Sequence, residues 1–586
     1  MTESRNHRLR RARPVLALAA VAFAVGAIVG AQHGTSAASA LADQFVSAWT
    51  RGDYVTMYGD IDPASQREYS ASSFADIYEQ ALRTATATRL RIVGRARASG
   101  ADVSIPVRVS TRLFGTLSLN FEVAIAEAGE GPPRVRWSRS LSFPGLRSGE
   151  QLSRRTSLPR RATLLARDGS VLAESPAGEA STEGTRSSPL GEAARAVIGT
   201  VGPVPASRLA ALEAEGVPAG ATVGLSGLER ALDDRLRGRA GGALLAGGRL
   251  LAYAAPRPAA PVRTTVSPTV QRAAVSALAG QLGGIVALQP STGQILAVAG
   301  IGLEGLQPPG STFKMVTLTG VLEAHIAAPH TVFPYATYAT LDGVKLSNAN
   351  GEDCGGSLEL AFAVSCNSVF SPLGVKLGAA RLVATAEKLG FNHETGVPGA
   401  AESTLPAAAD IQGELDIGST AIGQGQVLAT PLQMAIVAAA IADGGRRPAP
   451  SFVAGSASGG GRQVVSASVA RTVRHLMIGV VREGTGTAAA IPGVTVAGKT
   501  GTAELKSACK PETETGSGAE GKEASKESCH SSESEASNTD AWFAAFAPAL
   551  HPRIVVCVLL VEDGAGGATA APVARQVLEA GLHSGA

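Results

Sequence analysis

Lysine, histidine and cysteine are all scarce in this chain of 586 residues. Only nine lysines stand among the 52 Lys and Arg residues, and the first of them is Lys314. The nine histidines show no ligand-like pairing and the five cysteines form no Cys-x-x-Cys pair, so the sequence predicts no metal site. The net charge is only +3, and the excess lies in the first 13 residues. The near-neutral remainder argues against a nucleic-acid-binding protein, because such a protein needs a broad basic face.

Long apolar runs are also scarce, and the one that stands out is Val15–Ala31, directly after five arginines. Its length matches the lower limit of a membrane-spanning helix, and the arginines would hold the N-terminus in the cytoplasm. The alternative is a cleaved signal peptide with its cleavage site at Ala38–Ala40. We favour the uncleaved anchor, because a helical face of Leu41, Phe45 and Trp49 begins before that site. Either alternative places the rest of the chain outside the cytoplasm.

The cysteines outside the cytoplasm can form disulfides. Cys354 can pair with Cys366, and Cys509 with Cys529, but the sequence does not determine the pairing. Cys557 lies in the apolar segment RIVVCVLLV, which predicts a buried thiol.

Composition and periodicity predict a multidomain α+β protein. Two helical stretches and then alternating strand segments predict a small α+β unit near the N-terminus, with a curved sheet around the helices. The next region is rich in Ala, Gly, Pro and Arg, has a predicted hairpin turn at Asp168-Gly169, and holds no catalytic constellation. The last region has the order strand, helices, strand, which is typical of a mixed α/β domain. The predicted parts are a cytoplasmic tail (1–13), a membrane anchor (14–34), the α+β unit (36–147), the middle region (148–265) and the α/β domain (266–583) with a disordered polar insertion (506–538).

Three short motifs follow one another in the last domain. They are Ser311-Thr312-Phe313-Lys314, Ser365-Cys366-Asn367 and Lys499-Thr500-Gly501-Thr502. A Ser-x-x-Lys match alone is weak evidence, because chance gives roughly one in such a chain. Ser507-Ala508-Cys509-Lys510 in the polar insertion is a second match, and nothing near it could bury the lysine. The three motifs together, in order and in apolar surroundings, are a strong signal.

The first motif suits nucleophilic catalysis. Pro-Pro-Gly before Ser311 allows a helix to begin there, so Lys314 lies on the same face and can reach the hydroxyl. A neutral lysine amine can serve as the base that activates a serine, provided that burial or a nearby cation lowers its pKa. Lys499 is a candidate for that cation. The helix N-terminus also offers backbone N–H donors to a developing oxyanion.

The other two motifs suit the binding of a peptide. Ser365 and Asn367 alternate along the chain, so in an extended or looped segment their side chains face one way and Cys366 the other. By itself this pattern is more typical of an ordinary capping Ser and a turn Asn. The third motif follows the strand-like segment VTVA, and an edge strand there could pair with an extended peptide, with Gly501 permitting close approach. Its cation and hydroxyls suit a carboxylate terminus.

The three motifs resemble those of the penicillin-binding protein and serine β-lactamase superfamily. The segments EGTGTAAAIPGVTVAGKTGTAE, AIGQGQVLATPLQMA and IVALQPSTGQILAVAG resemble the transpeptidase domain of class B, monofunctional penicillin-binding proteins. Gly224–Glu229, together with LPRRATLLARDGSVLA, resembles their dimerisation or pedestal domain. AWTRGDYVTMY resembles the NTF2-like N-terminal domain of the MecA-type subgroup. The resemblance therefore implies an NTF2-like domain at 36–147, a pedestal at 148–265 and a β-lactamase-like serine transpeptidase domain at 266–583.

The resemblance implies a D,D-transpeptidase that needs no cofactor and cross-links peptidoglycan stem peptides, taken from a lipid-linked precursor, on the outer face of the membrane. Ser311 would form the acyl-enzyme, Lys314 would be its base and Ser365 would relay protons. Backbone N–H groups of Ser311 and Thr502 would form the oxyanion hole, and β-lactams would acylate the same serine. The residues implied to bind substrate are Asn367, Lys499, Thr500, Gly501 and Thr502.

Other functions stay open at this stage. A D,D-carboxypeptidase or a β-lactamase would use the same serine, and a non-catalytic β-lactam-binding scaffold would keep the fold alone. A β-lactamase needs only one domain of the size of 266–583, whereas more than 200 residues precede that domain here. The resemblance leaves open whether the chain has a glycosyltransferase or a division or elongation protein as partner.

Overall fold

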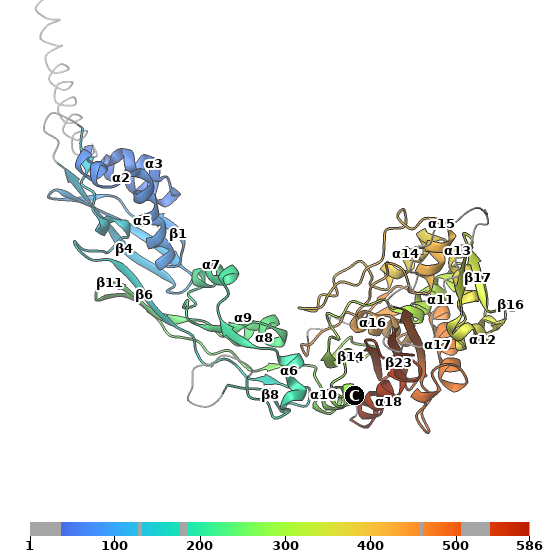
Figure 1. The fold of residues 1–586 in the computed structure, drawn as a ribbon. Helices are drawn as coiled ribbons and strands as arrows, with labels where there is room; N and C mark the ends of the chain where they lie inside the picture. The colour runs from blue at the N-terminus through green and yellow to red at the C-terminus, as the bar shows by residue number, and fades with distance from the viewer. Residues whose placement is uncertain (1–36, 127–131, 176–185, 456–460, 505–538, 585–586) are drawn as a thin grey trace, which may run out of the picture. The chain divides into compact units, whose positions relative to one another are not determined.

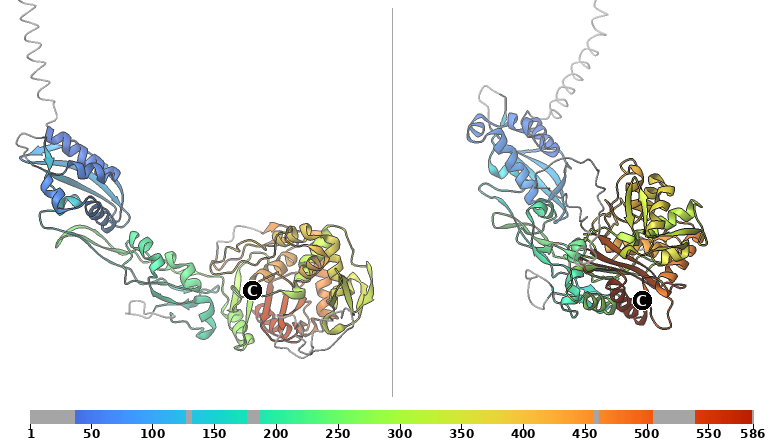
Figure 2. Two further views of the ribbon diagram at one scale, coloured as in Figure 1. Left: turned by 45° about the horizontal axis from the view of Figure 1, so that its top comes forward. Right: turned by 45° about the vertical axis from the view of Figure 1, so that its right-hand side comes forward.

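The computed structural model describes residues 37–126, 132–175, 186–455, 461–504 and 539–584. The expected anchor, the polar insertion and the pair Cys509–Cys529 lie outside these ranges. The chain forms two compact units (Figures 1 and 2). One consists of Met1–Pro159, Val204–Ala221 and Gly238–Pro258, and the other of Arg160–Pro203, Thr222–Arg237 and Ala259–Ala586.

The first unit begins with helices that pack on one face of a curved sheet, as the sequence predicts. The helices are α2 (Ala37–Arg51), α3 (Tyr54–Asp60), α4 (Pro63–Glu68) and α5 (Ala71–Thr84). Phe45 and Trp49 of α2 are fully buried, and the Trp49 ring lies 4.9 Å from that of Phe121. The expected first helical stretch is interrupted after Arg51, because the side chain of Asp53 caps a new helix by accepting from Thr56 N–H.

The sheet of the first unit has β1 (Ala87–Ile92), β2 (Arg97–Ser99), β3 (Asp102–Thr111), β4 (Thr116–Ala126) and β5 (Arg134–Val135). Their main path is β1-β3-β4-β5, with β2 paired to β3. Buried and exposed residues alternate along β3 and β4, so one face of the sheet packs on the helices and the other faces solvent. The unit also contains η1 (Arg139–Ser142), α7 (Ala206–Ala214) and a second sheet of β6 (Leu152–Ser157), β11 (Gly241–Ala246) and β12 (Arg249–Ala254).

The second unit opens with small elements held by buried ion pairs. The predicted turn at Asp168-Gly169 joins β7 (Leu164–Leu165) to β8 (Val171–Ala173) in an antiparallel hairpin. Glu229 is fully buried and receives charge-assisted hydrogen bonds from Arg161 and Arg186 at 2.5 and 2.7 Å. The buried charges are thus paired, which is the condition under which they are tolerated. Nearby elements are α6 (Glu192–Ile198), β9 (Val201–Pro203), β10 (Thr222–Gly224), α8 (Gly227–Ala231), α9 (Asp233–Leu236) and β13 (Val262–Arg263).

A five-stranded antiparallel sheet forms the centre of the second unit. Its order is β15-β14-β24-β23-β22, from β14 (Gly283–Leu288), β15 (Ile295–Gly300), β22 (Ala497–Glu504), β23 (Thr539–Ala547) and β24 (Ile554–Leu560). Every residue of β14 and β24 is buried, because helices cover both faces. α10 (Pro268–Leu278) and α18 (Ala570–His583) pack on one face, and α16 (Pro431–Ala442) packs on the other (Figure 1). β22 is an edge strand of this sheet.

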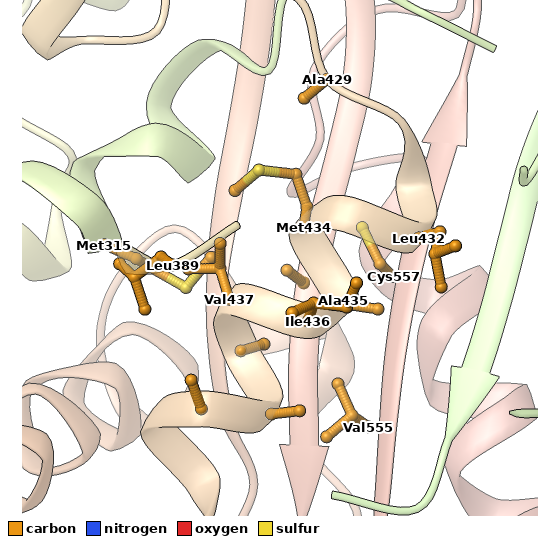
Figure 3. Close-up of a cluster of buried hydrophobic side chains, with 14 of the residues drawn as sticks. Met315, Leu389, Ala429, Leu432, Met434, Ala435, Ile436, Val437, Val555 and Cys557 are labelled. Atoms are coloured by element: carbon orange, nitrogen blue, oxygen red, sulfur yellow. The ribbon is translucent and has the colours of Figure 1, made fainter. Parts of the chain in front are cut away.

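The core on the α16 side also anchors the helix that follows Ser311. Figure 3 shows Met434 and Val437 of α16 beside Met315, and Leu432 near Cys557 of β24. Cys557 is a free, buried thiol, which confirms the prediction from its apolar run.

The remaining described elements surround this core. They are η2 (Gly310–Phe313), α11 (Lys314–Glu323), β16 (Val332–Ala336), β17 (Tyr338–Leu341), β18 (Val344–Ser347), η3 (Ala349–Gly351), β19 (Cys354–Ser357), α12 (Leu358–Ala363), α13 (Asn367–Leu377), α14 (Ala379–Lys388), α15 (Gly413–Ala421), β20 (Arg446–Arg447), β21 (Arg462–Gln463), α17 (Ala467–Arg482) and η4 (Thr487–Ala489). Within the described ranges no single helix has the length and apolar character to cross a membrane, although α13 and α14 meet that criterion as a pair bent by 98°.

Candidate active site

Ser311 lies at the start of the helix that carries Lys314, as the Pro-Pro-Gly signal predicts. Gly310 has a φ of 49°, and its N–H donates to Gly423 O at 3.0 Å. This left-handed glycine turns the chain into η2, which continues directly into α11. Ser311 is half-buried, whereas residues 314–322 are all buried, so the hydroxyl stands at the border between the core and the site.

The Lys314 amine is directed at the second motif. Its Nζ donates to Ser365 O at 2.7 Å and to Asn367 Oδ1 at 2.6 Å, and lies 3.4 Å from Ser365 Oγ. Lys314 and Ser311 are not hydrogen-bonded to each other in this structure. The Lys314 amine thus connects the first motif to the second, although Ser311 and Ser365 are 54 positions apart in the sequence.

The second motif presents Ser365 and Asn367 on one side, as predicted, but not through an extended segment. Ser365 has a φ of 63°, in the left-handed region that non-glycine residues rarely occupy, and Asn367 begins α13. Cys366 points away and forms a disulfide with Cys354 of β19. One of the two candidate cysteine pairs is therefore confirmed, and it ties the centre of this motif to a neighbouring strand.

The third motif lies within edge strand β22 rather than after a strand. A Cβ at Gly310 would lie 2.7 Å from Thr502 O, so the free edge of β22 runs beside η2. Because the N–H and C=O of one strand residue point to the same side, Thr502 N–H also points to this edge. A Cβ at Gly501 would lie 2.8 Å from Pro309 O. The glycine is thus needed for contact between the strand and η2, in addition to the expected approach of a ligand.

Lys499, like Lys314, lies beside Ser365. Lys499 Nζ donates to Ser365 Oγ at 2.9 Å and to Thr500 O at 3.0 Å. Both lysines are fully buried. Burial, and secondly the positive charge of Lys499, hold the pKa of Lys314 well below its ordinary value. Burial lowers the pKa of Lys499 to about 7. The arrangement therefore favours one neutral amine, on Lys314, beside one cation, on Lys499.

Two phenyl rings line the amine pair, and no sequence pattern singled them out. Lys314 Nζ lies 5.6 Å from the centre of the Phe370 ring, and Lys499 Nζ lies 5.6 Å from that of Phe362. Both rings are fully buried. They provide the low-polarity surroundings that lower an amine pKa, while their faces still attract a cation.

Thr485 is a further polar group at the site. Its Oγ1 lies 2.6 Å from Thr500 Oγ1, and its N–H donates to Ala363 O at 3.1 Å. Thr485 belongs to the segment EGTGTAA, whose resemblance to known transpeptidase domains was the available signal. Within the described ranges, no group of three or more His, Cys, Asp or Glu residues is placed to hold a metal ion.

Comparisons with known proteins agree with this geometry. Residues 283–579 match the family model of the penicillin binding protein transpeptidase domain. Residues 170–246 match the penicillin-binding protein dimerisation domain, and 37–150 match the NTF2-like N-terminal transpeptidase domain.

Two known peptidoglycan transpeptidases are similar to more than half of this chain. The peptidoglycan D,D-transpeptidase PbpA of Mycolicibacterium smegmatis is 33% identical over 61% of this chain and 80% of its own length. Its Mycobacterium tuberculosis counterpart is 32% identical over 55% of this chain and 72% of its own length. A solved ceftriaxone acyl-enzyme complex of penicillin-binding protein A from M. tuberculosis is 29% identical, with a TM-score of 0.56, over 72% of this chain and 98% of that one. A D,D-transpeptidase domain from Eggerthella lenta is 31% identical, also with a TM-score of 0.56, over 73% and 99%.

Proposed function

Since the chain belongs to the penicillin-binding protein transpeptidase family, we propose that it is a peptidoglycan D,D-transpeptidase that works through an acyl-enzyme on Ser311. The observation that carries this proposal is the buried Lys314 amine, held by Ser365 and Asn367 with Lys499 beside it. This constellation suits acyl transfer, because it supplies a base without histidine or metal.

Lys314 is the base for acylation. A neutral amine has two N–H groups and one lone pair, and the contacts to Ser365 O and Asn367 Oδ1 take both N–H groups. The lone pair is then left to accept the Ser311 proton. Ser311 Oγ attacks the carbonyl carbon of the penultimate D-Ala of a stem peptide, the C–N bond breaks, and the proton passes to the departing D-Ala amine. An acceptor amine then attacks the ester, gives its proton back to the base network and releases Ser311.

Ser365 connects the two amines and relays the proton between them and the leaving group. Lys499, Thr500 and Thr502 bind the terminal carboxylate of the donor peptide, since they place one cation and two hydroxyls along the edge of β22. Backbone N–H groups of Ser311 and Thr502 stabilise the oxyanion, because both lie where η2 meets this edge. A β-lactam carries a carboxylate and a reactive carbonyl, so it acylates Ser311 in the same way.

The localisation follows from the N-terminal sequence. We propose that residues 14–34 anchor the chain in the membrane in a single pass, with residues 1–13 in the cytoplasm and the catalytic domain outside. Cleavage at Ala38–Ala40 would remove the first turn of α2, including Ser39, which is 8% exposed. This observation supports the uncleaved anchor. The same proposal assigns 36–147, 148–265 and 266–583 to the NTF2-like, pedestal and transpeptidase domains.

The test is labelling with penicillin followed by mass spectrometry of the modified peptide. We expect the label on Ser311 and none in Ser311→Ala. Ser507→Ala is the matched control, because it removes the serine of the second Ser-x-x-Lys match and should leave labelling unchanged. Labelling that persists in Ser311→Ala would contradict the proposal.

The reaction itself is tested with a D-Ala-D-Ala stem peptide and an acceptor amine. A cross-linked product with release of D-Ala is the expected outcome. Release of D-Ala without cross-linking would indicate a carboxypeptidase, and rapid turnover of penicillin would indicate a β-lactamase. A protein that forms no product with either substrate, yet binds penicillin, would be the non-catalytic scaffold.

A further inference from the structure

The solvent face of the sheet in the first unit carries a group of arginines far along the chain from the three motifs. Its strands β3 and β4 alternate between buried and exposed residues, and β1 alternates between half-buried and exposed ones after Thr88. The exposed set includes Arg89, Arg91 and Arg108. The buried residues of the sheet pack on α2 and α5, so the three arginine side chains on the opposite face point to solvent. β1 also has a register shift at Thr88, after which Arg89 and Arg91 follow the alternation.

The strand register places these residues in two neighbouring cross-strand rows. In the first row Arg89 lies opposite Ser110, which lies opposite Thr116. In the second row Arg91 lies opposite Arg108, which lies opposite Ser118. The two rows therefore present three guanidinium groups and three hydroxyls on one face, and no carboxylate.

Arg91 directly opposite Arg108 is unfavourable for the sheet, because like charges at paired positions repel each other. Within the described part of the chain, none of Arg89, Arg91 and Arg108 takes part in an ion pair. Glu122 lies further along β4, but its row is already balanced: Ser104 Oγ donates to Glu122 Oε1 at 2.7 Å, and Arg97 pairs with Ser104 from β2. That row therefore has no excess positive charge, whereas the two rows described above do.

The same six residues line a depression of about 540 Å³ on this face. We propose that it binds a phosphate group carrying at least two negative charges. One carboxylate carries a single negative charge, so it would leave the pair Arg91 and Arg108 with an excess positive charge. A phosphate dianion has enough charge and acceptor oxygens to receive N–H groups from two arginines at once, with the hydroxyls of Ser110 and Ser118 completing the set.

This site is independent of acylation at Ser311 and adds a binding activity to the first unit. Phosphate of this kind occurs on soluble phosphate compounds and on acidic lipids whose headgroup is a phosphate monoester. The chemistry is shared, and two probes separate the sources: inorganic pyrophosphate, and short-chain phosphatidic acid, whose phosphate monoester can carry two negative charges, with short-chain phosphatidylcholine as the neutral headgroup.

The experiment uses the full chain in a neutral detergent and measures binding by calorimetry together with the shift of the melting temperature. The test variant is Arg91→Ser with Arg108→Ser, which places two further serines on an exposed sheet face. The matched control is Arg67→Ser with Arg136→Ser, which removes two exposed arginines of the same unit. Labelling of Ser311 by penicillin and the melting temperature without ligand show that each variant is folded. Because the test variant loses a like-charge pair, we expect it to melt no lower than the original chain.

We expect saturable binding of pyrophosphate with a Kd tighter than about 1 mM, and at least about tenfold weaker binding by the test variant but not by the control. Binding of phosphatidic acid alone, lost in the test variant, would support the same site with a lipid as its source. Equal binding by both variants, or no binding of either anionic probe by the original chain, would overturn the proposal.

Discussion

Lys499 Nζ donates to Ser365 Oγ at 2.9 Å, and the same hydroxyl lies 3.4 Å from Lys314 Nζ. Ser365 therefore stands between two buried amines that are far apart in the sequence. Protonation of both amines at once is unfavourable, because burial penalises each charge and the two charges repel each other. Burial lowers the pKa of both amines, and the charge of Lys499 lowers that of Lys314 further, which is the residue next to the nucleophile.

The pH dependence of acylation should reveal this coupling. Acylation requires neutral Lys314, so the second-order rate of acylation by a penicillin should rise with pH through the lowered pKa of Lys314. Lys499→Met removes the charge while largely keeping the side-chain volume, and it should shift this rise of the acylation rate to higher pH. The rise should still occur below the ordinary pKa range of lysine, because burial is the larger cause of the lowered pKa. A rise that stays at the same pH would show that Lys499 does not act on Lys314.

Lys314→Arg should abolish acylation while leaving a cation in place. Arginine stays protonated at any accessible pH, so it cannot accept the Ser311 proton. We expect a loss of at least about 100-fold in the acylation rate, the lower range for removal of a general base. Lys376→Arg on α13 is the control for a Lys-to-Arg change in the same unit and should have no effect. Acylation of Lys314→Arg at a near-normal rate would exclude Lys314 as the base.

Thr485→Val should weaken the capture of the substrate carboxylate. The change removes the hydroxyl that lies 2.6 Å from Thr500 Oγ1 and keeps the shape of the side chain. A lost hydrogen bond of about 1 kcal/mol corresponds to roughly a fivefold effect. We expect this effect mainly in KM for a peptide donor, measured by D-Ala release. Thr472→Val on α17 is the control, because its hydroxyl bonds only to the backbone of its own helix. An unchanged KM would mean that Thr500 needs no support from Thr485.

Loss of the disulfide should reduce both stability and acylation. Cys354 and Cys366 close a loop with a sequence separation of 12, which by loop entropy stabilises the fold by about 3 kcal/mol. Replacing both by Ala should therefore lower the melting temperature of the unit. It should also slow labelling of Ser311, because Cys366 stands between Ser365 and Asn367 and helps to hold Ser365 in its left-handed conformation. Cys557→Ala, at the free buried thiol, should affect stability alone. Labelling at the original rate after removal of the disulfide would show that packing alone holds the motif.

Local sequence was sufficient to predict features in which few residues take part. The step from Ser311 to Lys314 is one helical turn, so Pro-Pro-Gly and the spacing were enough to place both on one helix start. The turn residues Asp168-Gly169 likewise predicted a hairpin, and the apolar run around Cys557 predicted its burial. These signals are local because backbone geometry and the partition of apolar side chains act over a few residues.

Other features were decided only by the tertiary structure. The left-handed Ser365, the placement of Lys499 beside Lys314, and the rings of Phe362 and Phe370 depend on how α11, α12, α13 and β22 pack together, and the spacing of residues along one segment cannot encode that. The three arginines of the first unit are a similar case. Each strand by itself only predicts an exposed arginine, whereas the pairing register brings Arg91 and Arg108 face to face. The sequence by itself determined which residues have the chemistry, through residue type and local spacing. Tertiary packing decided which of them act on one another, because pKa values and charge repulsion depend on distance and burial in space.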